Sequence, residues 1–176
     1  MRFARALAVL AVLAAAGCVS VPRYEGVAGA APAAIVSFAK GHKSGYGYSG
    51  SQTYSISENG QCNDTKVAAT LLWTTANQKT VKVPVGRRIV VLAATTYYFT
   101  TGVGWNGYGA VANTSTKSCD GSASFVPEAG HAYVVTQKAP YWGEACSMSV
   151  TDTTTGATPP SLAVKKDAIC VGHPAG

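Results

Sequence analysis

The chain is poor in charge and in the residues that enzymes use for acid–base or metal chemistry. Charged residues make up 12% of its 176 residues, with eight acids and three histidines. No H-x-H, H-E-x-x-H or C-x-x-C spacing occurs, which excludes the common zinc signatures. Like charges form no block of five or more, and no nucleic-acid-binding motif is present. We therefore expect no catalytic residue, no metal, no cofactor and no nucleic-acid partner.

Helical periodicity is absent beyond the N-terminus, whereas short β-branched and aromatic runs alternate with Gly, Asn, Asp and Pro. We expect Gly102–Gly109 to be a glycine-rich loop. The spacing of the runs predicts an all-β fold, a single antiparallel β-sandwich of the Ig-like or transthyretin-like kind over residues 33–176. The expected strands are Ala33–Ala39, Ser51–Ser57, Val67–Trp73, Lys79–Val85, Arg88–Thr101, Ser122–Phe125, Ala132–Gln137, Cys146–Thr151 and Leu162–Ile169.

The first residues have the pattern of an export signal. Arg2 and Arg5 precede an uninterrupted apolar run over Ala6–Ala16, and small residues follow. The run is too short to span a bilayer as a mature helix. We expect residues 1–17 to be a signal peptide.

The end of this signal resembles the lipobox of bacterial lipoproteins. The residues are Ala15-Ala16-Gly17-Cys18, with Ala15 where that family most often has Leu. The resemblance implies cleavage before Cys18 and acylation of Cys18, palmitate being a typical acyl group. An ordinary signal peptidase could instead cut after Ala16 or Ala30, because small residues stand at the required positions there.

With a lipid anchor at Cys18, the residues that follow would connect the membrane to the domain. Residues 18–32 are short of charge and rich in Gly, Ala and Pro, so we expect a flexible tether there. Several acyl chains on one residue anchor a protein stably. Val19 is not the Asp that tends to retain lipoproteins at the inner membrane. The resemblance therefore implies an outer-membrane lipoprotein that faces the periplasm.

Four cysteines remain once Cys18 is set apart. An even number in an exported chain indicates two disulfides, and their wide spacing argues against zinc. Three pairings are possible, and the sequence does not select one. We favour Cys62 with Cys119 and Cys146 with Cys170.

Two internal stretches resemble known envelope proteins. The stretch KVPVGRRIVV (Lys82–Val91) is similar to a strand–turn–strand element of transthyretin-like bacterial surface sandwiches. The stretch SFVPEAGHAYVV (Ser124–Val135) is similar to the tail of small envelope lipoproteins of unassigned function. Both resemblances imply a β-sandwich located in the bacterial envelope, and neither implies a catalytic residue.

Loop aromatics are the best candidates for ligand contact, because Trp and Tyr are favoured at interfaces and stack on sugars. The alternative is that they cover the open ends of the sandwich. The basic residues are scattered, which is typical of a solvated surface. The alternative is a weak affinity for anionic lipid headgroups or polysaccharide. The candidate aromatics are Trp105, Tyr108, Tyr141 and Trp142.

These patterns predict a membrane-anchored envelope lipoprotein that acts as a binding or structural module, with an envelope protein or a glycan as its partner. A carbohydrate-binding module, for glycan or peptidoglycan, is the alternative. A secreted hydrolase is least favoured. The stretch Gly47–Ser51 departs from a nucleophile elbow, and an enzyme would need His131 brought to an acid and a serine.

Overall fold

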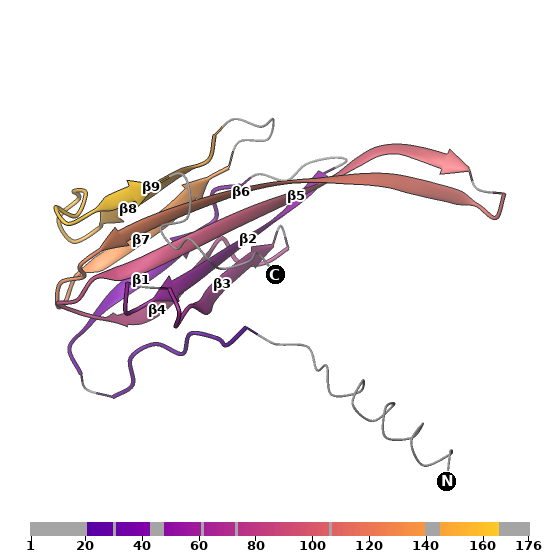
Figure 1. Ribbon diagram of the computed structural model, residues 1–176. Helices are drawn as coiled ribbons and strands as arrows, with labels where there is room; N and C mark the ends of the chain where they lie inside the picture. The colour runs from indigo at the N-terminus through magenta and orange to yellow at the C-terminus, as the bar shows by residue number, and fades with distance from the viewer. Residues whose placement is uncertain are drawn as a thin grey trace, which may run out of the picture.

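The computed structural model describes residues 21–29, 31–42, 48–60, 62–72, 74–105, 107–139 and 145–165. These residues form nine strands and contain no helix (Figure 1). The strands are β1 (Ala33–Ala39), β2 (Tyr48–Ser57), β3 (Lys66–Leu72), β4 (Gln78–Pro84), β5 (Ile89–Trp105), β6 (Ala110–Phe125), β7 (Ala132–Lys138), β8 (Ser147–Asp152) and β9 (Ala163–Lys165).

The strands form two sheets, with the orders β4-β1-β7-β8 and β3-β2-β5-β6-β9. Six of the seven strand pairs within the described chain are antiparallel, and β1 pairs with β7 in parallel. The predicted all-β class, with two packed sheets and a disulfide, is confirmed.

The core lies between the two sheets and follows from period-two alternation. In β1, the side chains of Ala34, Val36 and Phe38 are fully buried, while the side chains between them are not. Residues i and i+2 of a strand share one face, so this alternation turns one face of β1 inward. Phe38 stacks on Tyr54 of the other sheet with 4.9 Å between ring centroids, which packs the two layers together.

The disulfide pairing differs from the one we expected. Cys119 of β6 is bonded to Cys146, which precedes β8, with 6.0 Å between their Cα atoms. Our pairing of Cys62 with Cys119 and of Cys146 with Cys170 is therefore wrong. The cause is topological: β6 and β8 belong to different sheets but lie on the same side of the sandwich. Cys62 is also disulfide-bonded, while Cys18 and Cys170 lie outside the described residues.

Part of the segment expected as a tether lies against the sandwich. The Tyr24 amide donates to the Val67 carbonyl, and the Val27 amide donates to the Lys82 carbonyl. These bonds link the segment to the edge strands β3 and β4. The Tyr24 side chain is buried, and its hydroxyl donates to Glu58 Oε1 at 2.7 Å. The expected signal peptide, residues 1–17, lies outside the described chain.

The most prominent feature is the hairpin of β5 and β6, which runs far past the other strands (Figure 1). The last residue of β5 that pairs with β2 is Phe99. Beyond it, β5 and β6 continue as a two-stranded ribbon. The expected loop Gly102–Gly109 is therefore wrong in extent, because β5 reaches Trp105 and β6 begins at Ala110. We call residues 100–114 the arm.

Candidate functional site

The arm is an isolated two-stranded ribbon within the described structure. Thr100 pairs with Thr114, and Trp105 pairs with Ala110. The six residues from Thr100 to Trp105 extend about 20 Å beyond Phe99 at ~3.3 Å each. Among described strands, β9 covers β6 only over Ser122–Ser124, so both edges of the arm are open. Open edges are normally protected by charge or proline, and residues 100–114 contain neither.

A β-bulge at Thr101 decides which side chains share a face of the arm. The pairing register shifts between Thr100 and Gly102, so Thr101 has no opposite partner. Tyr98 pairs with Thr116 before the bulge, and Trp105 pairs with Ala110 after it. Thr116 and Ala110 lie an even number of residues apart in β6, so Tyr98 and Trp105 share the outer face. Without the bulge, Trp105 would lie on the inner face.

The end of the arm exposes large apolar side chains. Val103 is 71% exposed, Trp105 77%, Tyr108 100% and Val111 42%. We call these four residues the apolar tip. The remainder of the arm consists of Thr, Asn, Gly and Ala, with the threonines at its base. Exposed apolar groups gathered at one place indicate a contact surface.

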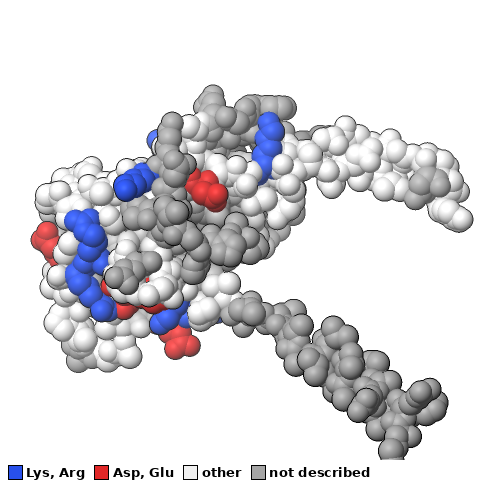
Figure 2. Space-filling view, in the orientation of Figure 1, with Lys and Arg blue, Asp and Glu red and all other residues white. Residues whose placement is uncertain are grey.

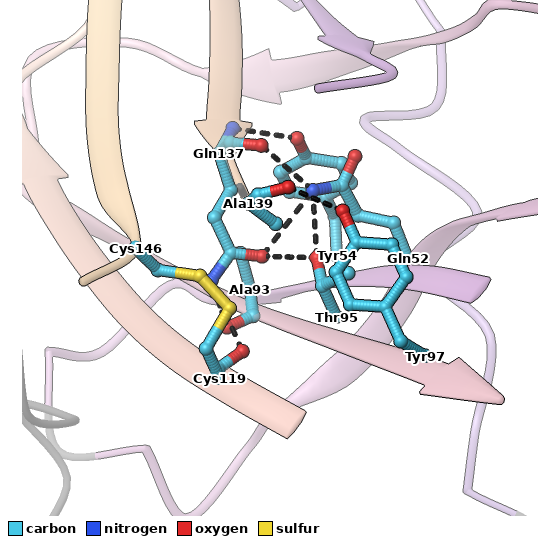
Figure 3. The surroundings of a disulfide bond; sticks show 9 residues. All are labelled: Gln52, Tyr54, Ala93, Thr95, Tyr97, Cys119, Gln137, Ala139 and Cys146. Atoms are coloured by element: carbon cyan, nitrogen blue, oxygen red, sulfur yellow. Dashed lines mark hydrogen bonds between the residues drawn. A yellow bond between two sulfur atoms is a disulfide. The ribbon is translucent and has the colours of Figure 1, made fainter. Parts of the chain in front are cut away.

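A buried polar network fixes the base of the arm (Figure 3). Gln52 Nε2 donates to Thr95 Oγ1 at 2.9 Å and to the Gln137 carbonyl at 2.8 Å. Thr95 Oγ1 donates to Gln137 Oε1 at 2.7 Å. Gln137 Nε2 donates to the carbonyls of Ala93 and Cys119. All three polar side chains are fully buried, and their bonds join β2, β5 and β6 to β7.

The network continues toward the arm through an aromatic ring and the disulfide. The Tyr97 hydroxyl donates to the Ala139 carbonyl, and the Cys119–Cys146 bond lies beside it (Figure 3). Gly41 occupies a site that tolerates no side chain, since a Cβ there would lie 2.0 Å from the Gln137 carbonyl oxygen. Both strands are thus attached to the opposite sheet just before the arm, through Tyr97 of β5 and Cys119 of β6.

Lysines gather at the end of the sandwich from which the arm leaves. Lys40 and Lys79 lie at this end of β1 and β4, and Lys138 ends β7. Lys117 pairs with Tyr97 at the base of the arm. All but Lys40 are exposed. Figure 2 shows the arm itself as a projection without charged side chains. Asp120, three residues after Lys117 in β6, is an exposed acid near this end, so the four lysines outnumber it and the described end has a net positive charge.

The opposite end of β7 carries a histidine–carboxylate cluster. His131 Nδ1 lies 2.7 Å from Asp152 Oδ2, and His131 Nε2 lies 3.8 Å from Glu128 Oε2. The hydrogen bond with Asp152 raises the pKa of His131. Burial alone would raise the pKa of Asp152, but hydrogen bonds from His131 and the Thr154 amide outweigh it and lower the pKa. Both ring nitrogens face carboxylates, so the cluster positions no hydroxyl nucleophile against a base.

A groove of about 370 Å³ opens between the edge strands β3 and β4. It is lined by Tyr24, by small side chains of β3 and by Arg23 and Lys79. Its described lining holds no acid, histidine or cysteine.

The structure describes two of the four predicted ligand-contact aromatics. Trp105 and Tyr108 lie on the apolar tip, whereas Tyr141 and Trp142 lie outside the described residues. Val103 and Val111 of the tip were not predicted. In the sequence, apolar residues alternate with glycine over Gly102–Val111. This alternation was interpreted as a glycine-rich loop and not as a strand.

Comparison of the chain with protein-family models, curated proteins and solved structures finds no match. Over the part of the chain that the structure describes, no helix is long and apolar enough to cross a membrane. The same residues contain no group of three His, Cys, Asp or Glu side chains arranged to hold a metal ion.

Proposed function

We propose that this chain is a non-enzymatic, lipid-anchored protein of the bacterial envelope, and that the arm is its binding element. The observation that carries the proposal is the apolar tip, held about 20 Å from the sandwich by an uncharged ribbon. A polar core and a disulfide brace the ribbon where it leaves the sandwich. Such bracing keeps the arm extended, which lowers the entropy lost on binding.

The anchor and compartment belong to the same proposal. The export signal and the lipobox-like residues before Cys18 support acylation there. A disulfide between the sheets is consistent with an oxidising compartment such as the periplasm. In this proposal Cys18 holds the protein on the outer membrane, and the sandwich presents the arm to a partner in the envelope.

A photo-crosslinking experiment in intact cells tests the binding element. A photoreactive phenylalanine analogue replaces Val103 on the tip, and the control places it at Thr155, an exposed residue at the opposite end of the sandwich. We expect an adduct from position 103 that is absent from position 155. The absence of any adduct at position 103 would refute the arm as a binding element.

A second experiment tests the anchor separately. We expect the mass of the mature N-terminus to show a diacylated or triacylated Cys18, and Cys18→Ser to move the protein from the detergent phase to the aqueous phase. An unmodified N-terminus at Gly17 or Ala31 would overturn the anchor and leave the arm untouched.

The two exposed aromatics of the tip favour one alternative, a glycan-binding module. Trp105 and Tyr108 could stack on sugar rings. Sugar sites are commonly concave, however, and the described part of the arm is a narrow ribbon. Sedimentation with purified peptidoglycan distinguishes this alternative, because it requires cosedimentation that Trp105→Ala abolishes.

A further inference from the structure

We propose that the apolar tip inserts into the interface of a lipid bilayer whose headgroups are anionic. This inference rests on the arm being the binding element, and it does not depend on acylation of Cys18. The partner is a lipid surface, and the contact is a shallow wedge made by Val103, Trp105, Tyr108 and Val111.

The chemistry of the tip fits the boundary between water and hydrocarbon. Trp and Tyr are enriched at that boundary because their rings are apolar and carry one polar group. Val103 and Val111 add aliphatic surface on the two faces of the ribbon. Residues 100–114 include no charged side chain, so insertion requires no charge to leave water.

The open edges of the arm limit the depth of insertion. Unpaired backbone N–H and C=O groups cannot enter hydrocarbon without a large cost. A strand needs about 9–11 residues to cross a bilayer, and β5 extends only from Thr100 to Trp105 beyond the sandwich. The rest of the arm carries Thr and Asn side chains, which suit the headgroup region or water. The arm therefore fits a wedge in the interface and does not fit a spanning element.

Charge complementarity selects the lipid. The arm leaves the end of the sandwich that carries Lys79, Lys117 and Lys138 as exposed cations. When the tip enters the interface, this end faces the membrane surface. These lysines lie about 20 Å or more from the tip. Their attraction to an anionic surface therefore acts at low ionic strength, where the Debye length is about 30 Å, and an anionic bilayer then binds more strongly than a neutral one.

A second copy of this chain, as the partner of the arm, explains fewer of its features than a bilayer does. Pairing of two copies along the open edge of β6 would satisfy the edge but leave the apolar tip unused. It would also bring two lysine-rich ends toward each other. A bilayer uses the tip, the uncharged ribbon and the cationic end together.

Tryptophan fluorescence tests insertion directly. The chain has three tryptophans, so Trp73→Phe with Trp142→Phe leaves Trp105 as the sole reporter. The full protein is mixed with vesicles of phosphatidylcholine, with or without phosphatidylglycerol, that contain lipids brominated at defined depths. We expect a blue shift of Trp105 and strongest quenching by shallow bromines in the phosphatidylglycerol vesicles. Unquenched Trp105 emission in both vesicles would overturn the proposal.

A matched pair of variants compares the tip with the strand just before the arm. Tyr108→Asp places a charge on the tip, and Tyr98→Asp places the same charge at the base, where Tyr98 is 46% exposed. We expect Y108D to lower the ratio of inserted to free arm about tenfold, equivalent to ~1.4 kcal/mol. We expect Y98D to leave this ratio within about twofold. Equal effects of the two variants would contradict a tip-specific contact.

The outcome also distinguishes this inference from the proposed function. Crosslinks from position 103 to a protein or glycan, with Trp105 unquenched by bromolipids, would keep the arm as binding element and refute the lipid partner. Crosslinks between the arms of two copies would assign the open edge of the arm to self-association. They would also refute the lipid partner. Acylation of Cys18 is read from the mass alone and affects neither result.

Discussion

At the scale of single residues, Gln137 is a fully buried side chain whose hydrogen bonds join the two sheets. Its amide accepts from Thr95 and donates to the carbonyls of Ala93 and Cys119. Gln137→Leu would remove these three hydrogen bonds and leave the Thr95 hydroxyl without its acceptor. We expect urea titrations to give a free energy of unfolding about 1–3 kcal/mol lower for this variant than for the wild type.

The matched control for Gln137 is the same substitution at an exposed position. Gln78 begins β4 and is exposed, so Gln78→Leu should change the free energy of unfolding by less than about 0.5 kcal/mol. A Q137L protein as stable as Q78L would show that the polar network contributes nothing net to stability.

His131 should make stability depend on pH. Its hydrogen bond with Asp152 raises the histidine pKa above 6.5, so protonation is favoured in the folded state. This contribution is fully present below pH 6.5 and is lost as pH rises through the raised pKa. We expect the stability difference between wild type and His131→Gln to shrink from about pH 5 to about pH 8.

The measurement for His131 is a series of urea transitions across that pH range, together with an NMR titration of the ring. Asp152→Asn should return the ring pKa toward its ordinary value, because the strongest partner of the imidazolium is removed. A difference between wild type and H131Q that stays constant with pH would contradict the assignment.

At the scale of elements, the Cys119–Cys146 bond ties the base of the arm to the opposite sheet. It closes a loop with a sequence separation of 27 residues. A loop of that size predicts a loss of about 3.5 kcal/mol when both cysteines become serine. Calorimetry or urea unfolding measures the loss. Peptide mapping without reductant should recover Cys119 linked to Cys146, and a link from Cys119 to Cys62 would refute the pairing.

The sequence predicts the strands of the sandwich well and the arm poorly, for one physical reason. Alternation is visible only where one face of a strand is buried and the other is exposed, as in β1. From Ala110 to Ser118, β6 is exposed on both faces, so its sequence of small and polar residues shows no period. Glycines in Gly102–Trp105 weaken the strand signal further, yet the pairing with β6 keeps them extended.

The site is only partly visible in the sequence. Trp105 and Tyr108 could be selected because exposed loops with Gly favour contact residues. The pairing of Cys119 with Cys146 depends on which edges of two sheets face each other, and no spacing along the chain encodes that relation. The grouping of Lys40, Lys79, Lys117 and Lys138 has the same origin, since these residues come from four different strands or strand ends.

At the scale of the whole molecule, charge is distributed unevenly along the sandwich. The arm end carries lysines, whereas the far end mixes both signs, as in the Arg87–Glu58 ion pair. If a bilayer is the partner, the arm end alone should steer the protein to an anionic surface. We expect Lys117→Glu with Lys138→Glu to weaken insertion of Trp105 into phosphatidylglycerol vesicles at ~0.01 M salt, where the Debye length of about 30 Å exceeds the distance from the tip to this end.

The control for this charge reversal is Lys66→Glu with Lys165→Glu, which lowers the net charge equally at exposed positions away from the arm end. This variant should insert almost as well as wild type, and its insertion should still weaken with added salt. Equal losses in the two double variants would mean that net charge alone governs binding. The cationic end would then not orient the protein. Orientation requires that the position of the lysines, and not only the net charge of the protein, changes how strongly the arm binds the membrane.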